Sequence, residues 1–168
     1  MTYTFKQTWT KEDYVAFATN HLLINFFKVQ NFILYFVSIG YLLITPLLTG
    51  KFTFFFIGLG LLAMMGFYIL YARRAAGKGY EKNKDLLSIS FVLNEEGLTY
   101  VTTEGEMTEP WAQFYSVKET KDYFFMYFTA QKGFLLAKRD LTEPMKNFIV
   151  KMFDEHMTNR RRVKLMKK

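Results

Sequence analysis

Two long uncharged, largely apolar runs lie back to back in the first half of the chain and limit where it can fold. The first covers Val29 to Gly50, the second covers Phe52 to Ala72, and only Lys51 separates them. A helix of roughly 20 apolar residues crosses the roughly 30 Å hydrocarbon core of a bilayer. In lipid a helix satisfies its own backbone hydrogen bonds, and each run is long enough to form one. We therefore expect an integral membrane protein with a transmembrane helical hairpin over residues 29–72.

Basic residues flank this hairpin on one side. Lys28 precedes the first run and Arg73 and Arg74 follow the second, whereas the connecting turn carries only Lys51. Lys and Arg next to a membrane span are retained in the cytoplasm. The pattern predicts a two-span protein of the cell membrane with both termini cytoplasmic.

The net charge of +7 is unevenly distributed. Residues 1–84 hold nine Lys/Arg and three Asp/Glu, residues 85–158 hold seven and twelve, and residues 159–168 hold six bases and no acid. Positive charge next to the spans and in the tail favours membrane lipids as partners. No basic stripe crosses the acidic part, so no nucleic acid partner is expected.

The remainder of the chain has the texture of strands and turns. After a charged linker over residues 73–85, residues 86–158 predict a cytoplasmic β-rich domain that ends in a helix. Thr142 is the expected cap of that helix. Its apolar residues fall on one stripe that must cover a sheet, and they are Met145, Phe148, Ile149, Met152 and Phe153. The expected strands are 87–93, 98–103, 107–111, 114–119, 123–129 and 134–138.

The first 28 residues predict a strand and an interfacial helix. Apolar and polar residues alternate from Tyr3 to Trp9, and Thr10 can cap a helix that begins at Lys11. We expect the strand to join the C-terminal sheet, because residues 86–158 alone make a small core. The fold class is thus an α+β membrane protein, a two-helix transmembrane hairpin plus a small antiparallel β domain with a C-terminal helix. Seven strands closed by one helix is the pleckstrin-homology-like plan.

The order of several short motifs resembles a known family. Glu12-Asp13-Tyr14 precedes the hairpin, Phe91-Val-Leu-Asn-Glu-Glu-Gly97 follows it, then come Pro110-Trp111, Val117-Lys118-Glu119 and Lys138-Arg139. This order resembles the YcxB-like family of small bacterial membrane proteins. The resemblance implies two transmembrane helices and a cytoplasmic β-rich domain, and it implies no established activity. The family pattern tends to read Pro-Lys-Arg where this chain has Ala137 before Lys138.

The residues give no reason to expect an enzyme. The chain has no cysteine, and its two histidines, His21 and His156, are in no metal-binding pattern. There is no phosphate-binding glycine loop and no nucleophile elbow. Acidic clusters fall at expected turns, and Trp111 is expected to anchor the core. No catalytic residue, metal or cofactor is predicted.

Two groups of basic residues are candidate lipid or partner sites. Lys138 and Arg139, at the end of the last strand, can bind an anion, a lipid headgroup or an acidic partner segment, or they are exposed strand-end charges. The basic tail, residues 159–168, can hold the domain on anionic lipid, or it is a solvated end. The tail candidates are Arg160, Arg161, Arg162, Lys164, Lys167 and Lys168.

Together these features predict a membrane-anchored cytoplasmic binding or scaffold module of unknown ligand, whose basic tail contacts anionic lipid. The alternative is an accessory subunit of a larger membrane protein complex, packed against an integral membrane protein or a second copy of the chain. No ionisable residue lies inside either run, which argues against a transporter.

Overall fold

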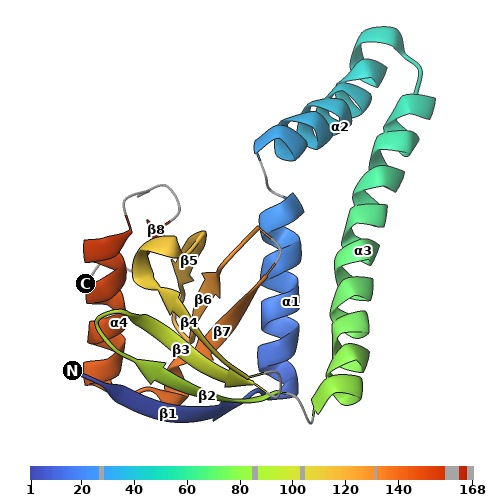
Figure 1. Cartoon of the computed structure of the whole chain (residues 1–168). Helices are drawn as coiled ribbons and strands as arrows, with labels where there is room; N and C mark the ends of the chain where they lie inside the picture. Colours follow the sequence, from blue (N-terminus) through green and yellow to red (C-terminus); the bar gives the residue numbers. More distant parts are fainter. Residues whose placement is uncertain (27–28, 85–86, 103–104, 131, 158–162, 166–168) are drawn as a thin grey trace. The chain divides into compact units, whose positions relative to one another are not determined.

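The computed structural model describes residues 1–26, 29–84, 87–102, 105–130, 132–157 and 163–165 (Figure 1). The chain forms two compact units. One unit combines Met1–Asp13 with Glu81–Lys168, and we call it the β unit. The other unit, the helical unit, covers Tyr14–Tyr80.

Three helices supply the helical unit: α1 (Lys11–Phe26), α2 (Val29–Thr49) and α3 (Thr53–Asn83). Helix α2 runs past Pro46 to Thr49, and it ends where the Gly50 amide donates to the Pro46 carbonyl at 2.8 Å. Gly50 has φ +70°, a conformation that glycine adopts without strain and that suits a helix end. The tight turn expected around residues 49–51 is therefore present.

Helix α3 is long and apolar enough to cross a membrane, and it is the one such helix within the described residues. Only 6% of its most apolar window is buried inside the structure. The apolar part of α2 that the structure describes, Tyr35–Thr49, is shorter than a span. The predicted presence of a long apolar helix is confirmed for α3.

Most of the expected linker over residues 73–85 is helical, because α3 continues to Asn83. Charge and two glycines suggested a linker, but Arg, Lys, Glu and Ala are all good helix formers. Gly79 has a packing reason to be in a helix: a Cβ added there would lie 3.3 Å from the Tyr14 hydroxyl of α1. The glycine lets the two helices approach closely.

Helices α2 and α3 approach closely at one of the four glycines in these two helices before Ala72. A Cβ on Gly58 would lie 3.2 Å from side-chain atoms of Leu42 and Leu43 on α2. Around Gly40, Gly60 and Gly66 no described atom lies within 4 Å of such a Cβ. The two helices therefore touch near Gly58 and leave the other glycine surfaces open.

The β unit contains two four-stranded sheets. The first has the order β1-β2-β3-β4 and is antiparallel throughout, and the second has the order β7-β6-β5-β8, in which only β5–β8 is parallel. The strands of the first sheet are Tyr3–Thr8, Ser88–Leu93, Gly97–Thr102 and Gly105–Pro110. Those of the second are β5 (Ser116–Glu119), β6 (Tyr123–Tyr127), β7 (Gly133–Ala137) and β8 (Val163–Lys164).

The N-terminal strand joins the C-terminal part of the chain, as predicted. Strand β1 pairs with β2 in a register that places Phe5 opposite Phe91, and these two rings stack at 5.2 Å. Trp9 extends the ladder, since its amide donates to the Leu87 carbonyl at 3.0 Å. A strand that lies before the helices in sequence thus completes a sheet that follows them.

A C-terminal helix, α4 (Glu143–His156), closes the core. The predicted stripe is confirmed, since Met145, Ile149, Met152 and Phe153 are buried and Phe148 is half-buried. Trp111, in the short helix η2 (Trp111–Gln113), meets the Phe153 ring edge-on at 5.1 Å. Strand β6 is buried on both faces, which suits its apolar sequence.

Candidate functional site

The candidate basic residues Lys138 and Arg139 begin a second short helix, η3 (Lys138–Asp140), directly after β7. The Arg139 guanidinium donates through Nη1 to Oδ1 of Asp13 at 2.7 Å and through Nη2 to Oδ2 of the same carboxylate. Asp13 is fully buried, whereas Arg139 is 46% exposed. This two-point pair joins the first turn of α1 to the end of the last β-hairpin.

Asp13 is held in place by the start of its own helix. The Thr10 amide donates to Asp13 Oδ2 at 2.8 Å, and the Asp13 amide donates to Thr10 Oγ1 at 3.3 Å. This reciprocal arrangement is a capping box, with aspartate at the position where glutamate is usual. Thr10 therefore caps α1 as predicted, and the cap also fixes the carboxylate that receives Arg139.

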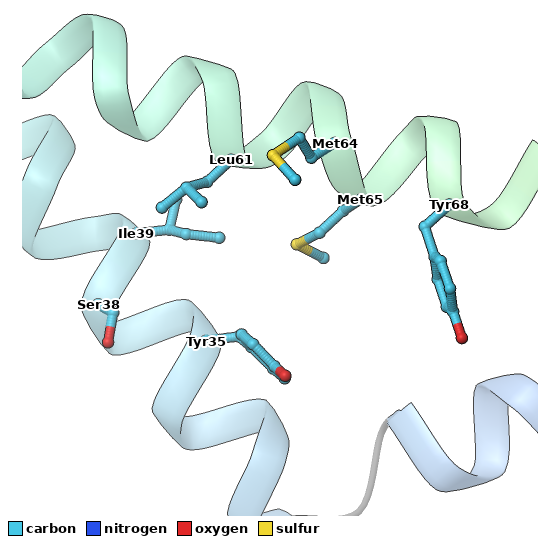
Figure 2. A pocket seen from close by; sticks show the side chains of 7 residues that line it. All are labelled: Tyr35, Ser38, Ile39, Leu61, Met64, Met65 and Tyr68. Atoms are coloured by element: carbon cyan, nitrogen blue, oxygen red, sulfur yellow. The ribbon is translucent and has the colours of Figure 1, made fainter.

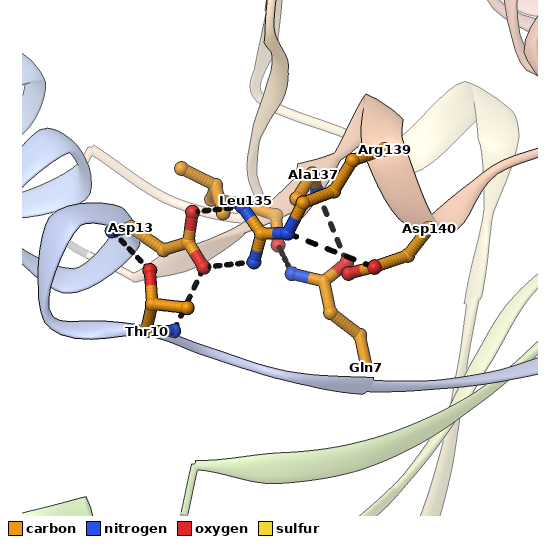
Figure 3. A network of polar contacts seen from close by, with 7 residues as sticks. All are labelled: Gln7, Thr10, Asp13, Leu135, Ala137, Arg139 and Asp140. Atoms are coloured by element: carbon orange, nitrogen blue, oxygen red, sulfur yellow. Dashed lines mark hydrogen bonds and ion pairs between the residues drawn. The ribbon is translucent and has the colours of Figure 1, made fainter.

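A buried glutamine lies beside this ion pair. Gln7 of β1 is 1% exposed, and its side-chain amide donates to the Leu135 carbonyl at 3.2 Å while its carbonyl accepts from the Ala137 amide at 3.0 Å (Figure 3). A side chain of the first sheet thereby satisfies backbone groups at the free edge of the second. Because buried backbone groups need partners, Gln7 acts as a polar link between the two sheets.

Electrostatics favour the ionised pair. Burial alone would raise the pKa of Asp13. The hydrogen bonds from Arg139 and Thr10 and the charge of Arg139 outweigh burial, so the pKa of Asp13 is lowered. The hydrogen bond to Asp13 is also the main reason why the pKa of Arg139 is raised. Nearby, burial and then the charge of Asp13 raise the pKa of Tyr123. The pair is thus charged at neutral pH.

Lys138 is also paired inside the β unit. Its Nζ donates to Glu119 Oε1 at 2.6 Å, and both side chains are nearly buried, at 13% and 11% exposed. The same Nζ lies 4.7 Å from the centre of the Phe124 ring, within range of a cation–π interaction. Lys138 is thus nearly buried and Arg139 is 46% exposed, and both are paired with acidic residues of the same chain.

The motifs picked out in the sequence meet in space. Asp13 pairs with Arg139, Glu119 pairs with Lys138, and Trp111 Nε1 donates to the Asn94 carbonyl at 2.8 Å. The paired residues are 17, 19 and 126 residues apart in sequence. These residues hold the β unit together, and any ligand at Lys138 or Arg139 must bind beside existing ion pairs.

A pocket of about 400 Å³ lies next to the two pairs. Its lining residues are Lys121, Asp122, Tyr123, Lys138, Arg139 and Lys146. Lys146 has its own partner, Glu143, at 2.8 Å. Lys121 has no ion pair with another described residue. The cationic groups that the pocket offers to an anion are therefore Lys121 and the exposed part of Arg139.

Most of the basic tail lies outside the described residues: this applies to Arg160, Arg161, Arg162, Lys167 and Lys168. The backbone of Lys164 belongs to β8, where it pairs with Lys118 of β5. The structure thus brings two tail residues to the edge of the second sheet, a pairing that the basic sequence did not predict.

Sequence reasoning missed Asp13 and Gln7 as parts of this network. Gln7 carried a signal, since it lies on the inward face of a strand between Phe5 and Trp9. Asp13 stood out only as part of the motif Glu12-Asp13-Tyr14. Among the described residues no group of three or more His, Asp or Glu side chains is placed to hold a metal ion.

Comparison with known proteins identifies a family. The family model described as YcxB-like protein matches residues 93–153, from the end of β2 into the last turns of α4. This match supports membership of the YcxB-like family for this region of the β unit. No curated protein and no solved structure matches the chain.

Proposed function

We propose that this member of the YcxB-like family is a membrane-anchored binding or scaffold module. Helices α2 and α3 cross the cell membrane, both chain termini lie in the cytoplasm, and the β unit binds its ligand there. The basic tail contacts anionic lipid. The function requires no catalytic group.

The observation that carries this proposal is the exposure of large apolar side chains along α3. Phe56, Met64, Phe67 and Tyr71 are each between 67% and 72% exposed. Soluble monomers rarely expose a continuous apolar surface of this kind, because its contact with water is unfavourable. In a bilayer the same side chains contact lipid chains.

The length of α3 fits a span with a cytoplasmic extension. Its 31 residues measure about 46 Å at 1.5 Å per residue, against roughly 30 Å of hydrocarbon. The surplus falls after Ala72, where Arg73, Arg74 and Lys78 are exposed. Bases at this end favour its retention in the cytoplasm.

Features of α2 support a second span. The hydroxyls of Thr45 and Thr49 donate to the carbonyls of Tyr41 and Thr45, at 2.7 and 2.9 Å. Polar groups satisfied inside their own helix are compatible with lipid. The 21-residue length of α2 matches the bilayer core.

Two sheets closed by α4 support a pleckstrin-homology-like plan for the β unit. Strands β1–β4 form one sheet, β5–β7 belong to the other, and the C-terminal helix follows. In this proposal an anionic lipid headgroup or an acidic partner segment binds the pocket at Lys121 and Arg139, and it leaves the Asp13–Arg139 pair intact.

Single-cysteine labelling in this cysteine-free chain tests the topology. A membrane-impermeant maleimide applied to intact cells should label Lys51→Cys and spare Ser88→Cys and Lys151→Cys, all three of which replace exposed residues. Labelling of Ser88→Cys in intact cells would contradict the proposal.

The exposed apolar surfaces of α2 and α3 also favour the second candidate function, an accessory subunit of a membrane complex. Val37, Leu47 and Leu48 of α2 are 65%, 84% and 80% exposed and are free to pack against partner helices. A stoichiometric membrane protein recovered with the chain from mild detergent would support this function.

A further inference from the structure

Two pockets, one in each unit, differ in the chemistry of their linings. In the helical unit, a hollow of about 710 Å³ between α2 and α3 is lined largely by apolar side chains, among them Ile39, Leu61 and Met65 (Figure 2). In the β unit, the pocket of about 400 Å³ beside Lys138 and Arg139 contains no aliphatic residue, and each of its six lining residues carries a charge or a hydroxyl. The second pocket therefore lacks the aliphatic side chains that would anchor an acyl chain or an apolar segment of a protein partner.

The lining of this second pocket is predominantly positive. Its charged groups are one acid, Asp122, and four cations, which are Lys121, Lys138, Arg139 and Lys146. Three of these cations pair with Asp13, Glu119 and Glu143, and none of the three acids lines the pocket. Asp13 and Glu119 are buried or nearly so, and they hold their cations in place without facing a ligand. The lining thus presents three net positive charges.

The guanidinium of Arg139 retains donors for a ligand. Two of its five N–H groups donate to Asp13, and the side chain is partly exposed (Figure 3). Its Nε lies 3.7 Å from Asp140 Oδ1, which is longer than a hydrogen bond. Asp13 fixes the plane of the guanidinium, so the remaining donors are held in position before a ligand arrives.

Lys121 supplies a cation that has no acidic partner. It is exposed, it lies in the turn between β5 and β6, and it makes no ion pair with another residue that the structure describes. The turn is tied to the end of β7, because the Lys138 amide donates to the Asp122 carbonyl at 2.9 Å. This contact brings Lys121 and Arg139 to the same pocket although they are on different hairpins.

We propose that this pocket binds a terminal phosphate group, with Lys121, Arg139 and Lys146 as the donors. The inference rests on the proposed function, in which the β unit binds its ligand here, and it names the chemistry of that ligand. A terminal phosphate places three acceptor oxygens and about two negative charges around one atom, which suits several convergent cations. A carboxylate offers two oxygens and one charge. The phosphate can belong to a lipid headgroup or to a soluble phosphomonoester, because the recognised group is the same.

Lysine footprinting of the full-length protein in detergent tests this site. An N-hydroxysuccinimide ester acetylates exposed lysines, and mass spectrometry measures the rate at each one. At constant ionic strength, about 10 mM glycerol 3-phosphate would fill most of a site with a dissociation constant of about 1 mM, and it should slow acetylation of Lys121 about tenfold. The rate at Lys151, which lies outside the pocket, should not change. An unchanged rate at Lys121 would overturn the proposal.

Other anions identify the chemistry and the source. Glutamate at the same ionic strength should protect Lys121 much less, and equal protection would overturn the choice of phosphate. Water-soluble dihexanoyl phosphatidic acid that protects at lower concentration than glycerol 3-phosphate would assign the group to a lipid headgroup, and equal potency would assign it to a soluble phosphomonoester. Protection by a hexaglutamate peptide but not by phosphate would keep the proposed binding module and overturn the phosphate site. A failure of the proposed membrane topology would appear in the cysteine labelling and leave this footprint unchanged.

Two substitutions of opposite sign sharpen the result, with the protection of Lys146 as the readout. Lys121→Gln removes the cation without a partner and should raise the phosphate concentration for half-protection about tenfold, whereas Asp122→Asn removes the lining acid and should lower it about threefold. The matched controls are Lys151→Gln and Glu155→Gln, which alter an exposed pair outside the pocket and should leave it unchanged. Arg139 is kept, because it also neutralises Asp13. The same direction of change in Lys121→Gln and Asp122→Asn, or no change in either, would overturn the proposal.

Discussion

Asp13 and Arg139 form a two-point ion pair although 126 residues separate them in sequence. The two sides of the pair are unequal, since Asp13 is fully buried and Arg139 is 46% exposed. Removing one partner of a buried pair leaves the other without compensation, and the cost depends on how well water can replace the missing partner. We therefore expect the loss of stability to differ between substitution of Arg139 and substitution of Asp13, which would not be expected for a surface ion pair.

Arg139→Ala should destabilise the β unit by about 3 kcal/mol, because it leaves the Asp13 carboxylate buried and unpaired. Asp13→Ala should cost less, because water already reaches Arg139. Chemical unfolding of the full-length protein in detergent, followed by Trp fluorescence, measures both. Lys151→Ala is the control: its pair with Glu155 is exposed and 3.8 Å long, so its loss should cost at most about 0.5 kcal/mol. Equal losses for the two members of the Asp13–Arg139 pair would contradict this reasoning.

The lowered pKa of Asp13 predicts a pH dependence of stability. A carboxyl group whose pKa is lower in the folded state stabilises the fold above its unfolded-state pKa, about 3.9, and loses this contribution as the pH falls through the folded-state value. The stability difference between the natural protein and Asp13→Asn should be constant from about pH 5 to 7 and shrink below about pH 4. Denaturant titrations at several pH values test this, and a difference that persists undiminished to about pH 2 would contradict it.

Substitution of Gln7 should lower stability for a different reason, the loss of two hydrogen bonds to buried backbone groups. Gln7→Met keeps the approximate shape of the side chain but leaves the Leu135 carbonyl and the Ala137 amide without their partner. Each unsatisfied buried group costs about 1–3 kcal/mol. Amide hydrogen exchange in the peptide containing Ala137 should accelerate, while Lys6→Met, at the neighbouring exposed position, should leave it unchanged. Unchanged exchange in Gln7→Met would show that the bridge is not needed.

Local patterns in the sequence predicted the elements whose cause is local. Alternation predicted β1 and β2, a helical stripe predicted α4, and the capping motif placed the start of α1 at Thr10. The helical end of α3 was missed because glycine and charge were weighed above the helix propensity of the residues around them. Gly79 also packs against Tyr14 of α1, and no local pattern shows this contact.

The polar network of the β unit could be predicted only in part. Lys138 and Arg139 were singled out as binding residues, but their acidic partners lie on other elements, 19 and 126 residues away in sequence. Pairing Asp13 with Arg139 depends on β1 joining β2 in one register, which the periodicity of β1 alone does not determine. The parallel contact of β8 with β5 is equally non-local, and it lies in a tail whose composition indicates only charge.

The last prediction concerns the basic tail as an electrostatic clamp. Residues 85–158 carry an excess of five negative charges, which an anionic leaflet would repel, and residues 159–168 carry six positive charges. Each base near an anionic surface contributes about 1 kcal/mol. Trypsin, which cleaves after Arg and Lys, should cut at Arg160, Arg161 and Arg162 more slowly in nanodiscs of anionic lipid than in neutral ones. At about 0.5 M salt the Debye length falls to roughly 4 Å, and the protection should disappear.

The control for the clamp is internal to the chain. Cleavage after Lys84, which lies outside the tail, reports any general effect of lipid on the protease and should respond less to lipid charge and salt. Slow cleavage of the tail in neutral nanodiscs, or protection that persists at high salt, would assign the protection to the folded domain instead. Pairing of Val163–Lys164 with β5 would then be the natural cause, because a strand held in a sheet resists proteolysis without any lipid.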